Sequence, residues 1–81
     1  MTDVRKLVRD FIIQESYVED LRDDALVLED GTLDSLTLVR LVGVLIRELD
    51  IKIEAHEVTA ASFGSVNAIV DFVTGRLPRT A

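Results

Sequence analysis

Residues 34–49, DSLTLVRLVGVLIREL, carry the strongest structural signal in this 81-residue chain. Apolar side chains recur there every three or four residues, as on one face of an α-helix: Leu38, Leu41, Val42, Leu45 and Leu49. Asp34 is a residue type that caps helix starts. The pattern therefore predicts a central helix over residues 35–49.

Two further helices flank the central one in the sequence. Near the N-terminus the same spacing places these apolar side chains on one face: Val4, Leu7, Val8, Phe11 and Ile12. Thr2 or Asp3 is suited to cap that helix. After Ser65 the inward-facing set consists of Val66, Ile69, Val70, Phe72 and Val73. Gly75 and Pro78 are expected to end this last helix.

The stretch between the central and the last helix has a weaker pattern. Ile51 and Ile53 alternate with a lysine, as in an extended link. Residues 54–61 have room for only one or two helical turns, in which we expect Val58 to face the core and His56 to lie at the surface.

Three longer helices, a short third one and no strand pattern predict an all-α fold. The helices form a small bundle around one core, and residues 1–81 make a single domain. Its tail, residues 77–81, is expected to fray.

The segment between the first two helices is long, acidic and without a helical period. The chain has 15 acidic and nine basic residues, a net charge of −6, and eight of the acidic residues lie in residues 15–34 against a single arginine. Such a surface repels nucleic acid, so we expect no nucleic-acid partner. We predict a long acidic loop over residues 16–32, anchored by Leu21, Leu26 and Leu28.

Composition excludes several kinds of site. The chain has no cysteine and one histidine, which rules out disulfides, cysteine nucleophiles and a histidine-based metal site. Charged residues interrupt the first ten positions, which is unlike a signal peptide, and no apolar run approaches the ~20 residues of a membrane span. We expect a cytoplasmic protein with no membrane partner.

Ser35 stands out because it lies in the first turn of the central helix. The first backbone N–H groups of a helix are unpaired and its dipole is positive there, so a phosphate on this hydroxyl would be stabilised. Taken alone, however, a serine at this place most often only assists the cap.

Several features together resemble the acyl carrier and peptidyl carrier protein family over nearly the whole chain: Leu-Asp-Ser-Leu at residues 33–36, the apolar helix after it, Ile51 with Ile53, Phe63, and the helix from residue 65 to 75. The resemblance implies a four-helix bundle of acyl-carrier type. In that family the motif serine opens the second helix and carries a 4′-phosphopantetheine arm, whose thiol holds an acyl or aminoacyl group as a thioester. By this resemblance Ser35 is the attachment site.

The family also implies the partners. A phosphopantetheinyl transferase takes the arm from coenzyme A, a ligase loads the acyl or aminoacyl group, and synthases or transferases use it downstream. The chain itself would be a monomeric carrier and no enzyme, and its lack of cysteine fits because the reactive thiol belongs to the arm. We predict a stand-alone acyl carrier protein that holds acyl intermediates, with an aminoacyl or peptidyl carrier as the alternative.

The residues around Ser35 receive roles from the same resemblance. Asp34 would lie beside magnesium and coenzyme A during arm transfer. Leu36, Val39 and Ile46 make the apolar stripe wider than contact with one neighbour needs, so some of them should be exposed, and we assign Leu36 and Val39 to partner binding.

Two basic residues depart from the family's fatty-acid-synthesis members, whose second helix presents carboxylates. Here Arg40 and Arg47 occupy that surface, and residues 35–50 carry no net charge. We assign both arginines to partner binding and infer a dedicated pathway of the secondary-metabolite kind. Gly43 costs the helix about 1 kcal/mol relative to alanine. We expect close helix packing to offset this cost, with room for a tethered chain or a partner as the alternative.

Three other functions fit the sequence less well than a carrier. A hydrolase using Ser35 lacks both a neighbouring histidine and the Gly-x-Ser-x-Gly elbow. The acidic loop lacks the alternate-position spacing of a calcium-binding EF-hand, and we expect no metal site. The strongest rival is an unmodified helical module whose exposed apolar residues dock a partner helix.

Overall fold

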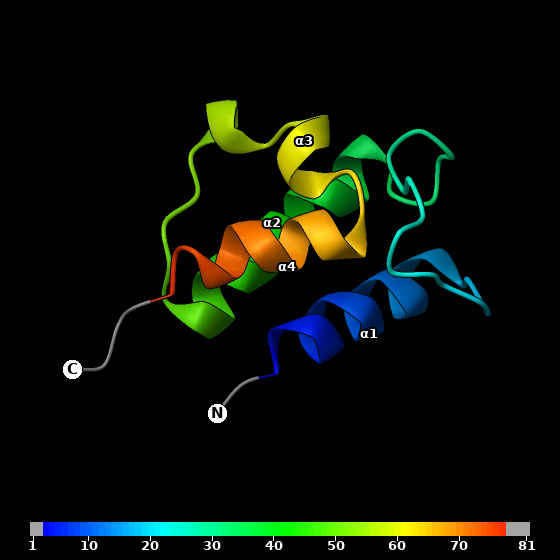
Figure 1. Cartoon of the computed structure of the whole chain (residues 1–81), viewed down its shortest axis with the longest axis horizontal. Helices are drawn as coiled ribbons and strands as arrows, with labels where there is room; N and C mark the ends of the chain where they lie inside the picture. Colours follow the sequence, from blue (N-terminus) through cyan, green and yellow to red (C-terminus); the bar gives the residue numbers. More distant parts are fainter. Residues whose placement is uncertain (1–2, 78–81) are drawn as a thin grey trace.

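A computed structural model of the chain describes residues 3–77. In those residues four α-helices and one 3₁₀ turn follow one another, with no strand: α1 (Val4–Ser16), α2 (Ser35–Leu49), η1 (Ala55–Glu57), α3 (Ala60–Phe63) and α4 (Val66–Thr74). The all-α prediction is confirmed, as is the predicted extent of the central helix. In Figure 1, α2 and α4 overlap and run in the same direction, and α1, which contacts both of them, runs in the opposite direction.

The first helix begins and ends as its local sequence directs. Asp3 caps α1, because its Oδ1 accepts from the backbone N–H of Lys6 at 3.1 Å. The helix ends where Tyr17 takes a left-handed conformation with φ of 56° and donates its N–H to the carbonyl of Ile13. Val4, Val8 and Ile12 are buried, while the other two predicted core residues, Leu7 and Phe11, are half-buried against the core.

The connection from residue 17 to 34 has no helix, as expected, but its anchors differ from our prediction. Leu21 is buried and Leu28 is half-buried, whereas Leu26 is 57% exposed, so the expectation that Leu26 anchors the loop was wrong. Val27 is completely buried in its place. Its backbone N–H donates to the carbonyl of Gly64 at 2.9 Å, which fixes the loop to the end of α3.

One carboxylate of the acidic loop is tied to the rest of the bundle. Asp23 accepts from Arg5 at 2.6 Å and from Arg9, and its backbone carbonyl accepts from the N–H of Asn67 at 3.0 Å. Partial desolvation raises the pKa of Asp23, but the hydrogen bonds and charges of the two arginines outweigh it, and the pKa lies below its usual value. The loop is therefore held by ion pairs as well as by apolar contacts.

The core lies where α1, α2 and α4 meet. α2 contributes the buried side chains Leu41, Leu45 and Leu49, and α4 contributes Val66, Ile69, Val70 and Val73. Burying one such side chain stabilises the fold by about 1.5–3 kcal/mol, so the burial of these apolar side chains strongly favours folding. Phe63 of α3 is also fully buried and packs against Phe72, with 5.5 Å between ring centroids.

Two details of the C-terminal half bear on our predictions. Gly64 is buried, and a Cβ there would overlap the carbonyl oxygen of Ala60, so only glycine fits between α3 and α4. Leu77, the first residue of the tail that we expect to fray, is half-buried against the core. Residues 78–81, like Thr2, lie outside the described residues.

Candidate functional site

Ser35 is the first residue of α2 and is exposed. Within residues 3–77 its hydroxyl takes part in no hydrogen bond. The preceding residue, Asp34, is the N-cap: its Oδ1 accepts from the backbone N–H of Thr37 at 2.8 Å. The cap is therefore provided by the aspartate, which leaves the serine hydroxyl accessible for chemistry.

The charge of Asp34 is held in the ionised form. The hydrogen bond from the backbone N–H of Thr37 lowers the pKa of Asp34 below its ordinary value. An exposed carboxylate thus stands directly beside the serine at neutral pH, within the positive end of the helix dipole.

An exposed apolar surface continues from Ser35 along α2. Leu36 is 70% exposed, Val39 is 67% exposed and Ile46 is 37% exposed, so all three residues of the broad stripe reach solvent. This confirms the expectation of surface exposure for Leu36 and its two companions. Their spacing places them on one side of the helix, over about three turns.

Gly43 lies on the same side of α2, and our explanation for it was wrong. It is exposed, and a Cβ built there has no neighbour within 4 Å, so close packing inside the chain does not require glycine.

The two arginines that we assigned to partner binding have acidic neighbours. Arg40 forms an ion pair with Glu15 at 2.5 Å, which links α2 to the end of α1. The Nε of Arg47 lies 3.9 Å from a carboxylate oxygen of Glu48. Both arginine side chains remain more than half exposed.

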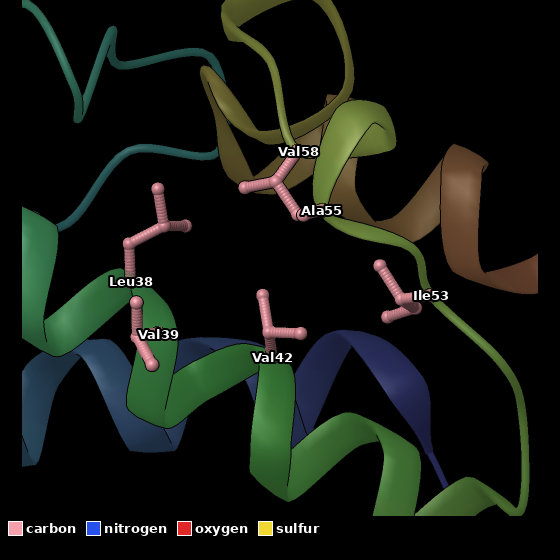
Figure 2. A pocket seen from close by; sticks show the side chains of 6 residues that line it. All are labelled: Leu38, Val39, Val42, Ile53, Ala55 and Val58. Atoms are coloured by element: carbon pink, nitrogen blue, oxygen red, sulfur yellow. The ribbon is translucent and has the colours of Figure 1, made fainter.

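An apolar pocket of about 430 Å³ opens next to this surface. Three of its lining residues come from α2 and three from the segment that follows Ile51: Leu38, Val39, Val42, Ile53, Ala55 and Val58. Figure 2 shows the two sets facing one another across the cavity. Leu38 and Val39 lie one helical turn after Ser35, so the pocket begins beside the candidate site.

Sequence reasoning missed this pocket. We placed Leu38 and Val42 on the inward face, and the structure shows them half-buried at the edge of the core, where they line the cavity. The i, i+4 spacing of these two residues, followed by Ile53 and Val58 in the weakly patterned link, is the only signal that the sequence offered.

The rival sites gain no support. In the part of the chain that the structure describes, no group of three His, Asp or Glu side chains is placed to hold a metal ion. His56 is exposed on η1, with its Nδ1 3.6 Å from Glu54, and forms no hydrogen bond with Ser35. Among residues 3–77, no helix is both long enough and apolar enough to cross a bilayer.

Comparison of the chain with protein-family models, with curated proteins and with solved structures finds no match in any of the three.

Proposed function

We propose that the chain is a carrier protein, whose Ser35 bears a 4′-phosphopantetheine arm and presents cargo on it as a thioester. The single observation that carries the proposal is the placement of Ser35. It is an exposed serine with an unengaged hydroxyl at the first residue of the central helix, and it lies one turn from an apolar pocket.

The start of α2 suits a phosphodiester. On arm transfer the Ser35 Oγ would bond to the phosphorus that bears pantetheine while the pyrophosphate bond of coenzyme A breaks, adenosine 3′,5′-bisphosphate would leave, and the hydroxyl proton would pass to a base of the transferase. The negative charge of the phosphodiester would then lie where backbone N–H groups lack helical partners. The Asp34 carboxylate accepts from the N–H of Thr37 at 2.8 Å, and a weaker contact with the N–H of Leu36 also lowers its pKa. Asp34 also offers a negative charge for the magnesium that accompanies the coenzyme during arm transfer.

The lining of the pocket favours acyl cargo over aminoacyl or peptidyl cargo. All six side chains that line it are aliphatic, so it offers an apolar chain burial but gives an ammonium or an amide no partner. Its volume is within the range of small-molecule pockets. Aminoacyl or peptidyl cargo is the second candidate, and such cargo would remain in solvent.

The exposed face of α2 provides the contacts for the enzymes of the cycle. Leu36 and Val39 stand beside the attachment site and offer apolar contacts to the transferase, the loading ligase and the downstream enzymes. Arg40 and Arg47 give this face a charge pattern suited to partners of a dedicated pathway. The chain itself then performs no catalysis, and it acts as a monomer in the cytoplasm, where coenzyme A is available.

Incubation with coenzyme A, magnesium and a broad-specificity phosphopantetheinyl transferase tests the proposal. Intact mass spectrometry should show the gain of one phosphopantetheine on the native chain and on Ser65→Ala, a control that removes the serine capping α4. Ser35→Ala should gain nothing. A folded native chain that stays unmodified beside a modified positive control would shift the argument to the unmodified helical interaction module, for which the exposed Leu36 and Val39 are the supporting observation.

A further inference from the structure

The outer wall of the apolar pocket has few attachments of its own. It is formed by residues 52–58, in which no side chain is buried. The backbone hydrogen bonds of η1 remain inside this segment, from Glu57 N to Glu54 O and from Val58 N to Ala55 O. Residues 52–58 therefore depend on contacts with other parts of the chain to hold their position against α2.

Arg76, just beyond the end of α4, supplies such contacts. Its Nη1 donates to Glu57 Oε1 at 3.0 Å and to the carbonyl of Lys52 at 3.3 Å, and its Nη2 donates to Glu57 Oε2. The two parallel bonds to one carboxylate form a bidentate pair. The guanidinium carbon lies 4.8 Å from the ring centroid of Phe72, which holds the side chain against α4.

Glu57 links the Arg76 ion pair to the backbone of η1. Its Oε1 also accepts from the backbone N–H of Glu54 at 3.0 Å and thereby completes the capping box of η1. Its side chain is only 17% exposed, so the ion pair is shielded from solvent on this side. In residues 3–77 the segment is also tied by the bond from the Ser62 hydroxyl to the carbonyl of Glu57 and by the packing of Ile53 and Val58 against the core.

We propose that Arg76 is a positioning residue for the pocket. Its hydrogen bonds to the Lys52 carbonyl and the Glu57 carboxylate, together called the clasp, hold Ile53, Ala55 and Val58 at the distance from α2 that an apolar chain needs. The role in cargo selection rests on the proposed carrier function. The role in forming the pocket does not, because the clasp exists in the chain without any arm. A lysine at this position keeps the charge but cannot form the planar, bidentate pair, so the clasp requires arginine.

The test uses the unmodified chain and two readouts. One is amide hydrogen exchange, resolved for residues 53–58 and for α1 and α4. The other is the dissociation constant of N-phenyl-1-naphthylamine, a neutral apolar dye that fluoresces when buried. Arg76→Gln should speed exchange in residues 53–58 and weaken dye binding, each by about fivefold, a modest effect because the guanidinium is partly exposed.

Three variants separate the clasp from general destabilisation. Glu57→Gln keeps an acceptor for the N–H of Glu54 but loses the bidentate ion pair, so it should reproduce Arg76→Gln. Arg76→Lys should bind the dye as weakly as Arg76→Gln, because lysine cannot form the bidentate pair. Arg5→Gln is the matched control, because it removes a guanidinium that bonds Asp23 and Asn67 on the other side of the fold and should leave the dye constant unchanged.

Two results overturn the proposal: wild-type exchange and dye binding in folded Arg76→Gln and Glu57→Gln, or an equal loss of dye binding in Arg5→Gln. The outcome is independent of the carrier proposal. If Ser35 takes up no arm and the clasp variants behave as expected, only the carrier function fails. If Ser35 is modified and the variants bind dye as the native chain does, only the clasp fails.

Discussion

Gly43→Ala should stabilise the fold and Gly64→Ala should destabilise it, although each substitution adds a single methyl group. Gly43 lies inside α2, and its added Cβ would have open space within 4 Å. Alanine there removes the helix penalty of glycine, and we expect stabilisation of about 0.5–1 kcal/mol. For a domain of this size, 1 kcal/mol corresponds to about 4–8 °C in Tm.

At Gly64 the added Cβ would overlap the carbonyl oxygen of Ala60, which belongs to the backbone of α3 and has little freedom to move aside. The backbone carbonyl of Gly64 also accepts from Val27, so a shift of this turn disturbs the anchor of the long loop. We expect a loss of about 1–3 kcal/mol, as for other overpacked sites.

Thermal and urea unfolding followed by far-UV circular dichroism would measure both effects, with the urea m-value checked for constancy. Destabilisation by Gly43→Ala would contradict the reasoning, because it would show that the position requires glycine for a contact inside the chain. A harmless Gly64→Ala would equally refute the close approach of α3 and α4.

Three further predictions concern charge and backbone strain. The pKa of Asp23 is lowered in the folded state, so its contribution to stability is present above the unfolded pKa of ~3.9 and is lost as the pH falls through the folded value. Asp23→Asn should therefore flatten the decline of the unfolding free energy below about pH 4. An unaltered acid profile would count against this ion-pair contribution. Tyr17 is 89% exposed at a φ of 56°, so Tyr17→Gly should raise stability by about 1 kcal/mol in urea unfolding, and a loss would indicate a contact that the fold does not show. Arg40→Gln should cost about 0.5 kcal/mol through its pair with Glu15, whereas Arg47→Gln should be neutral; equal urea midpoints would dismiss that pair.

The parts of the fold that the sequence predicted are those with local causes. Asp3 and Asp34 cap α1 and α2 by accepting hydrogen bonds from N–H groups three residues ahead, and such signals lie within one turn of the chain. The apolar period of residues 35–49 likewise depends only on neighbours in the helix. These features were therefore correct to the residue for α2.

The errors arose where the deciding partner lies far along the chain. Leu26 and Val27 are both suitable loop anchors by type, and the choice between them is set by the carbonyl of Gly64. The loop has no regular spacing of apolar residues that would indicate which side chain faces inward.

The candidate site shows the same division. Ser35, Asp34 and the exposure of Leu36 follow from a motif and a helical stripe, both local. The pocket needs Ile53 and Val58 to face α2, and its clasp joins Glu57 to Arg76 across 19 positions of sequence. No periodicity reports such a pairing, since two charged residues in exposed stretches have many possible partners.

The most direct test of the central claim is a thiol titration of the denatured chain with Ellman's reagent, before and after incubation with coenzyme A and a phosphopantetheinyl transferase and removal of free coenzyme. The chain contains no cysteine, so every protein-bound thiol must belong to an attached arm. We expect a change from no thiol to one thiol per native chain and no thiol on Ser35→Ala. An unchanged native chain, or a thiol that persists in Ser35→Ala, would contradict it.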